Sequence, residues 1–172
     1  LADVDSTTFT NVTMNWAVVT DGDNEKMVLD GTTFDLGTTI GATTTGGNAY
    51  SVTVVADTGA DTATVTITKQ GGGLFSEAEA ETLIEAIQYQ HSDGDNPTNG
   101  NRTVAITVSD GSDNSLAATT TINVNPVNDA PTLNLDANDS SGAGGNNYLF
   151  TFTENDSATA IVDTDLNLTD VD

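Results

Sequence analysis

The 172-residue sequence predicts an all-β fold, an antiparallel β-sandwich with one short helix. Two observations predict it. Apolar and polar residues alternate with a period of two in several short segments, and clusters of Gly, Asp and Asn separate these segments. Strands that bury one face and solvate the other show this alternation, and such clusters are typical of the turns between strands.

Four segments carry the alternation most clearly, each with apolar residues on one face and mainly Thr on the other. They are residues 62–68, 103–109, 119–124 and 148–153. A further strand is expected over 132–135. β-branched residues on a half-buried, pleated surface favour strand formation, so each of these segments is expected to pair in a sheet.

One segment departs from this period and predicts a helix at about 77–88. Ser76 is followed three residues later by Glu79, which is the pattern of a capping box. Leu83 and Ile87 then fall on one helical face. We expect this helix to cross one end or side of the sandwich.

The segment Asn-Pro-Val-Asn-Asp-Ala-Pro at 125–131 predicts a domain boundary. Two prolines bracket a polar stretch directly after a strand, which stiffens the connection and stops the sheet from continuing. We therefore divide the chain into a sandwich repeat at 1–125, a linker at 126–131 and the beginning of a second repeat at 132–172. The motif at 1–5 (LADVD) returns at 168–172 (LTDVD), which indicates a tandem array.

The charge balance points to bound cations. The chain has 26 Asp and Glu residues against 3 Lys and Arg, and its formal net charge is -23. Repulsion on this scale opposes a compact state, so the strand patterns imply that divalent cations neutralise part of it. Nucleic acid and anionic membrane surfaces are excluded as partners because both require basic residues. There is no Cys, so metal sites would take the place of disulfides.

Several acidic and amide residues are spaced to bind Ca2+, which prefers six to eight oxygen ligands. Carboxylates at positions i and i+2 of an extended segment can reach one ion together. The candidates are Asp3, Asp5, Asp110, Asn128, Asp129, Glu154, Asp170 and Asp172. Two similar groups, Asp21-x-Asp23-x-Glu25 and Asp93-x-Asp95, lack the Glu at the twelfth position of an EF-hand loop and are interpreted as turns.

The order of these motifs resembles a cadherin-like repeat of the giant bacterial surface adhesins known as RTX adhesins. Residues 152–155 (FTEN), 160–162 (AIV) and 168–172 (LTDVD) resemble the opening of such a repeat. Residues 108–111 (VSDG) and 127–131 (VNDAP) resemble its close. The predicted helix resembles the version found in the bacterial adhesins.

The resemblance implies an immunoglobulin- or cadherin-like sandwich with calcium at the junctions between repeats. Glu154 would be the acid of a first strand, and Asn128 and Asp129 would be linker ligands. Asp170 and Asp172, and equivalently Asp3 and Asp5, would be acids of the following repeat, with Asp110 on the same ion as Asp3 and Asp5. In such a repeat the first body would lack its first strand, and a segment like 148–166 of a preceding repeat or of a neighbouring chain would cover the open sheet edge.

Three functions follow as expectations. The first is a calcium-rigidified structural module of an extracellular adhesin or fibre on a bacterial cell surface, mediating cell adhesion and biofilm attachment, with neighbouring repeats or like chains as head-to-tail partners. The second is a module that itself binds glycans or a like module, which an exposed aromatic cluster around Trp16 would favour. The third, a hydrolase with paired carboxylates, lacks an apolar pocket signal. We expect no enzymatic activity and no membrane insertion.

Overall fold

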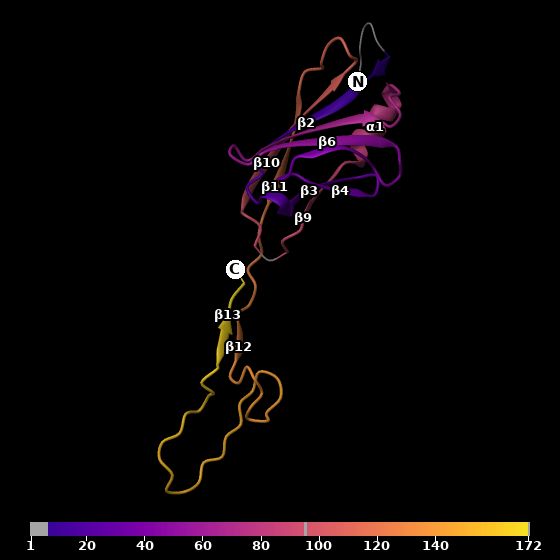
Figure 1. The fold of residues 1–172 in the computed structure, drawn as a ribbon. Coiled ribbons are helices and arrows are strands. Elements are labelled where there is room, and N and C mark those ends of the chain that lie inside the picture. The colour runs from indigo at the N-terminus through magenta and orange to yellow at the C-terminus, as the bar shows by residue number, and fades with distance from the viewer. Residues whose placement is uncertain (1–6, 95, 172) are drawn as a thin grey trace. The chain divides into compact units, whose positions relative to one another are not determined.

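The computed structural model describes residues 7–94 and 96–171, and the chain divides into two compact units at Leu1–Pro126 and Val127–Asp172 (Figure 1). The first unit contains β1 (Thr8–Phe9), β2 (Asn11–Ala17), the 3-10 turn η1 (Gly22–Asn24), β3 (Glu25–Leu29), β4 (Thr32–Asp35), β5 (Ile40–Thr44), β6 (Tyr50–Asp57), β7 (Thr62–Lys69), β8 (Phe75–Ser76), α1 (Glu77–Ala86), β9 (Gln88–His91), β10 (Gly100–Ser109) and β11 (Ala118–Val124). The second unit contains β12 (Thr132–Asn134) and β13 (Asn167–Thr169).

The first unit is an all-β sandwich built from antiparallel strands. A six-stranded sheet has the order β11-β10-β2-β7-β6-β5, and a three-stranded sheet has the order β4-β3-β9. β1 and β8 form a separate short pair. The expected all-β class with one short helix is confirmed, and the expected strands at 62–68, 103–109 and 119–124 lie within β7, β10 and β11.

The core lies between the two sheets because the alternation is in register across neighbouring strands. Trp16 of β2 lies opposite Ala63 of β7 and Val104 of β10, and all three are buried. Met27 of the facing three-stranded sheet and Leu83 of the helix belong to the same cluster of buried side chains. The Thr-rich faces of the strands remain toward solvent, as the period of two predicts.

The helix α1 begins with the capping box that its sequence predicts. The Ser76 side chain accepts a hydrogen bond from the Glu79 backbone N–H, and the Glu79 carboxylate accepts one from the Ser76 backbone N–H. Lys69 donates to Glu79 at 2.6 Å. The hydrogen bonds from Lys69 and Ser76 lower the pKa of Glu79 to about 2, so the box keeps its charged acceptor in mildly acidic solution.

Replacing Ser76 with Ala is expected to lower the free energy of unfolding of the first unit by about 1 kcal/mol, because the backbone N–H of Glu79 loses its acceptor at the helix start. Urea unfolding followed by the fluorescence of Trp16, the single tryptophan, measures this. Ser112→Ala changes an exposed loop serine and serves as the control. Equal urea midpoints for the two variants would show that the box contributes nothing.

A buried polar cluster interrupts the apolar core beside β9 and β10. Arg102 is 1% exposed and donates from Nε to Glu25 Oε1 at 2.9 Å, from Nη2 to Asp21 Oδ2 at 2.7 Å and from Nη1 to the carbonyl of Thr98 at 2.9 Å. Glu25 is 0% exposed. These bonds hold Arg102 against Asp21 and Glu25, two residues from a distant part of the sequence.

Two further groups complete the cluster. The hydroxyl of Tyr89 donates to Glu25 at 3.4 Å, and His91 Nε2 lies 3.0 Å from Asp21 Oδ2. Burial, together with the charge of Glu25, raises the pKa of Tyr89 to about 12. Burial alone would raise the pKa of Asp21, but hydrogen bonds from Thr98 and His91 and the Arg102 charge outweigh it and hold that pKa below its ordinary value.

This cluster corrects the sequence-based interpretation of Asp21-x-Asp23-x-Glu25 as a turn. The turn covers only part of this group: it is the 3-10 turn η1 at Gly22–Asn24. Glu25 begins β3, and its carboxylate points to Arg102 rather than to solvent. His91, the last residue of β9, also lies in the cluster.

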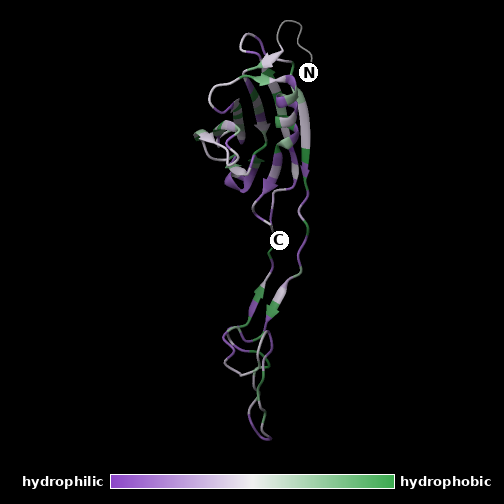
Figure 2. Cartoon of the chain, turned by 90° about the vertical axis from the view of Figure 1, so that its right-hand side faces the viewer, coloured by the Kyte–Doolittle hydropathy of each residue, from purple (hydrophilic) through white to green (hydrophobic). Residues whose placement is uncertain are grey.

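The second unit has one pair of short strands and a long loop between them. Thr132, Leu133 and Asn134 of β12 lie opposite Thr169, Leu168 and Asn167 of β13. Figure 2 shows hydrophobic and hydrophilic residues interspersed along this unit. The expected strand at 132–135 is thus formed over Thr132–Asn134.

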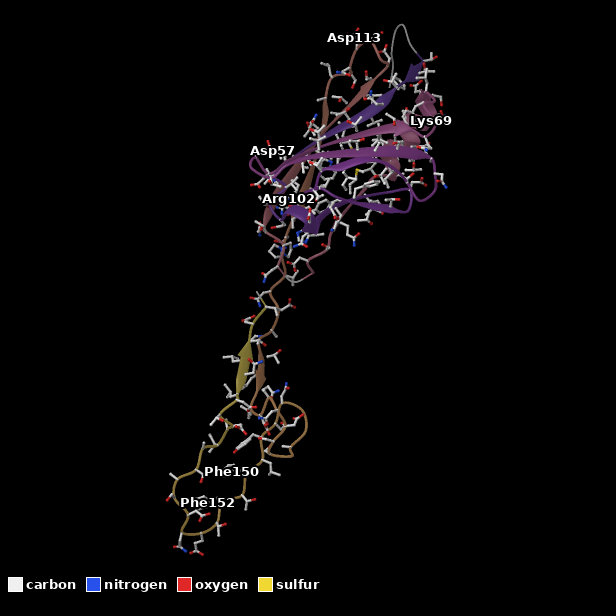
Figure 3. All side chains as sticks on the ribbon, in the orientation of Figure 1. Asp57, Lys69, Arg102, Asp113, Phe150 and Phe152 are labelled. Carbon is white, nitrogen blue, oxygen red and sulfur yellow. The ribbon has the colours of Figure 1, made fainter. Side chains whose placement is uncertain are left out.

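The expected strand at 148–153 is not formed. These residues adopt an irregular conformation, and Phe150 and Phe152 are 38% and 56% exposed. Figure 3 shows both side chains on the loop between β12 and β13. Alternation predicts only that a segment can be a strand; a strand also needs a neighbour to take its backbone hydrogen bonds, and none of the described strands pairs with this segment.

Candidate metal centre

The strand pair of the second unit brings together residues from its two ends. Asp136 follows β12 by two residues, and Asp163 and Asp165 lie shortly before β13. The backbone N–H of Asp163 donates to the carbonyl of Leu135 at 3.1 Å, which holds the two segments side by side. Three carboxylates that are distant in sequence therefore meet.

These three aspartates are the candidate metal ligands. One carboxylate oxygen from each of Asp136, Asp163 and Asp165 lies within 4.8 Å of the others. Within residues 7–94 and 96–171 this is the one group of three or more acidic, His or Cys side chains close enough to hold an ion together. Carboxylate oxygens are the ligands that hard cations prefer.

Hydrogen bonds from the following loop orient the carboxylate of Asp136. It accepts from the backbone N–H groups of Ser140 and Ser141 at 2.9 and 2.8 Å, and Asp136 itself is 0% exposed. Hydrogen bonds from the Ser141 side chain and backbone lower the pKa of Asp136. A hydrogen bond from Ser140 likewise lowers the pKa of Asp163, so the cluster favours the charged state.

The donor set fits a cation. Asp165 accepts from the backbone N–H of Asn138 through Oδ2, but its Oδ1 is buried and has no hydrogen-bond partner in the part of the chain that the structure describes. None of Lys26, Lys69 and Arg102 lies in 127–172, and His91 lies outside it as well, so no side-chain cation of this unit can compensate the cluster. Burying carboxylates without compensation is costly. A divalent ion bound there would supply positive charge and bind Asp165 Oδ1.

The described residues that the sequence predicts to bind calcium lie outside this cluster. Asp110 follows β10 and caps a turn, accepting from the backbone N–H groups of Ser112 and Asp113 at 2.8 Å each. The Asn128 amide donates to the carbonyl of Asp129 at 2.5 Å, within the linker. None of these three belongs to the cluster.

Two more of these residues lie in the second unit. Glu154 is exposed in a turn of the loop, and Asp170 is exposed directly after β13. Asp3, Asp5 and Asp172 lie outside the described residues. A calcium-binding role for these eight residues remains a prediction.

The sequence did contain a signal for the cluster. Asp163 and Asp165 have the same i, i+2 spacing that selected Asp3 with Asp5 and Asp170 with Asp172. Asp136 gave no such signal, because its partners lie on the far side of a loop. The pairing of β12 with β13 is what connects the two ends.

Comparison with known proteins assigns no family to the chain. No protein-family model, no curated protein and no solved structure matches it. In the described part of the chain, no helix has the length and apolar character needed to cross a bilayer. The function must therefore be argued from the residues themselves.

Proposed function

We propose that this chain is a calcium-stabilised structural module of an extracellular adhesin on a bacterial cell surface. The observation that carries the proposal is the buried Asp136 beside Asp165 Oδ1, which has no hydrogen-bond partner within 7–94 and 96–171, in a unit without basic residues. Asp136, Asp163 and Asp165 would hold the ion. Ca2+ would supply the positive charge that offsets their mutual repulsion.

Three features support this role and location. Metal-stabilised folding suits a chain without Cys in an environment where disulfides would otherwise be used. Calcium sites of extracellular modules are characteristically weak and are filled because calcium is abundant there. The motif order of the chain resembles adhesin repeats, in which calcium stiffens successive modules.

The position of the cluster suits a stiffening role. Asp136 lies five residues after Pro131, the last residue of the linker, and the ion would tie this segment to the residues that precede β13. An ion bound there would order the chain directly after the linker. Stiff connections between modules project an adhesive tip from a surface without requiring any catalytic group.

The glycan-binding alternative is less well supported. This alternative predicts an exposed aromatic cluster around Trp16. Trp16 is instead 3% exposed and packs in the core, where its ring centroid lies 6.1 Å from that of Tyr89. Tyr50 and Tyr89 are partly buried against the same core. Buried aromatic rings do not offer the flat exposed platform that sugars require.

Small-angle X-ray scattering of the whole chain tests the stiffening role. We expect a narrower distribution of end-to-end distances in saturating Ca2+ than in EDTA, and Asp165→Asn should remove this difference because it removes one of the three charges that hold the ion. Asp156→Asn is the matched control: Asp156 lies in the same unit outside the cluster and accepts only from its own turn. Identical distributions in Ca2+ and EDTA would contradict the role.

A further inference from the structure

The sandwich of the first unit is open along one side. A groove of about 360 Å³ lies between β10 and β11 of the six-stranded sheet and the segment formed by α1 and β9. Its walls are mainly apolar. Four of the lining residues are isoleucines that are only partly buried, Ile84, Ile87, Ile106 and Ile122.

One of the residues that line this groove carries a buried hydrogen-bond donor without an acceptor among the described residues. Trp16 lines the groove, and its indole Nε1 is buried with no hydrogen-bond partner among the described residues. A buried N–H of this kind normally has a partner, because leaving it unpaired costs about 1–3 kcal/mol. A peptide carbonyl entering the groove could accept from it.

One wall of the groove is an unprotected sheet edge. β11 is the end strand of its sheet, so one row of its backbone groups has no neighbour among the described strands. It pairs with β10 in unbroken register and carries no charged residue and no proline. The opposite edge, β5, is interrupted by a register shift between Ile40 and Thr43. Charges, prolines and bulges are the usual protection of edges, and β11 has none of them.

The second unit carries a segment with the properties of the missing strand. Residues 148–153 (YLFTFT) carry an aromatic residue at every second position, contain no charge and pair with no described strand. Tyr148 and Phe150 lie on one side, with ring centroids 6.0 Å apart. Phe150 and Phe152 are 38% and 56% exposed, so these two aromatic rings lack an apolar surface to cover them. In a strand, Tyr148, Phe150 and Phe152 would share one face.

We propose that residues 148–153 of a second copy of this chain add to β11 as an extra strand, with Tyr148, Phe150 and Phe152 in the groove. Addition of a strand to an exposed edge supplies backbone hydrogen bonds, and alternate side chains fill the adjoining pocket. The groove and the segment are different surfaces of one chain. Association is therefore head-to-tail and builds longer oligomers as concentration rises.

The linker favours a second copy over the chain's own loop. Pro126 and Pro131 fix their own φ angles, and each biases the residue before it toward an extended conformation. Only seven residues separate β11 from β12. A tight reversal within this segment, which would return the loop to its own groove, is disfavoured. The proposal involves no metal ion, so its outcome is independent of the calcium proposal.

Complementation between two variants tests the pairing. Phe150→Ser with Phe152→Ser removes the donor but leaves the groove, whereas Ile122→Lys blocks the groove but leaves the donor. Each variant alone is expected to be monomeric in sedimentation analysis at physiological salt, which screens the repulsion between chains of net charge -23. Mixed together, the two should form a dimer, because one intact groove then meets one intact donor.

Two measurements make the result specific. Loss of both Phe side chains should weaken self-association of the chain at least about 100-fold, whereas Leu149→Ser, on the opposite face, should leave it within about threefold. Trp16 fluorescence should shift as the parent chain associates and stay constant in the donor variant. The donor residues lie in an irregular loop, so that variant tests the idea even if Ile122→Lys disturbs the fold.

Three results would overturn the proposal. The parent chain could remain monomeric at all concentrations with unchanged Trp16 fluorescence. Leu149→Ser could weaken association as much as the Phe substitutions, which would indicate nonspecific apolar contact. The Trp16 signal could depend on Phe150 and Phe152 in a chain that stays monomeric, which would place the segment in its own groove.

Discussion

Arg102→Ala is expected to lower the free energy of unfolding of the first unit by about 3–5 kcal/mol, the largest effect of any single substitution considered for this protein. The variant leaves Glu25 fully buried without a positive partner and removes the donor to Asp21. The loss of stability comes mainly from the negative charge of Glu25, which stays buried without compensation. The intact ion pair itself contributes little net stability, because both charges lose their hydration on folding.

Two control variants separate this explanation from a simple loss of charge. Lys69→Ala removes one positive charge from the surface pair with Glu79 and should cost at most about 1 kcal/mol. Arg102→Met combined with Glu25→Met removes both buried charges and should recover much of the loss. Urea unfolding monitored by Trp16 reports all three. If Arg102→Ala costs no more than Lys69→Ala, the cluster does not hold a buried charge pair.

Removal of calcium is expected to destabilise the second unit and leave the first unchanged. An ion that binds only the folded state, present at 100 times its dissociation constant, adds about 2.7 kcal/mol, or about 100-fold in the equilibrium for opening. Amide hydrogen exchange resolves the effect by residue. In EDTA the N–H groups of Ser140 and Ser141, which donate to Asp136, should lose about 100-fold in protection, while those of β7 should not change.

Trp16 supplies an independent check because it lies in the first unit. Its urea midpoint should be the same in Ca2+ and in EDTA. Mg2+ should not replace Ca2+, since it requires tighter octahedral geometry and retains its water. If exchange at Ser140 and Ser141 is the same with and without calcium, the ion is not bound between β12 and β13.

The strands and the helix could be predicted from the sequence because their causes are local. The alternation that defines β7 and the capping box that begins α1 each lie within a few adjacent residues. The segment 148–153 also carries large apolar or aromatic side chains at every second position, yet it forms no strand within the described chain. Alternation describes which side of a strand can be buried, whereas strand formation depends on a neighbour that the pattern does not identify.

The two polar clusters were harder to predict because their members come from distant parts of the chain. Arg102 binds Asp21 and Glu25, about 80 residues earlier, and the spacing of those acids resembles an ion-binding loop when considered alone. Asp136 meets Asp163 and Asp165 only because β12 pairs with β13. Local spacing could identify Asp163 with Asp165, but it could not identify which third carboxylate would join them.

Calorimetric titration of Ca2+ into the metal-free chain tests the proposed calcium site most directly. We predict saturable binding at physiological salt that Asp165→Asn weakens at least about tenfold, corresponding to a loss of about 1.4 kcal/mol or more, and that Asp156→Asn leaves unchanged. Asp136→Asn should weaken it in the same way. Absence of saturable binding, or equal weakening by Asp156→Asn and Asp165→Asn, would contradict a calcium site formed by Asp136, Asp163 and Asp165.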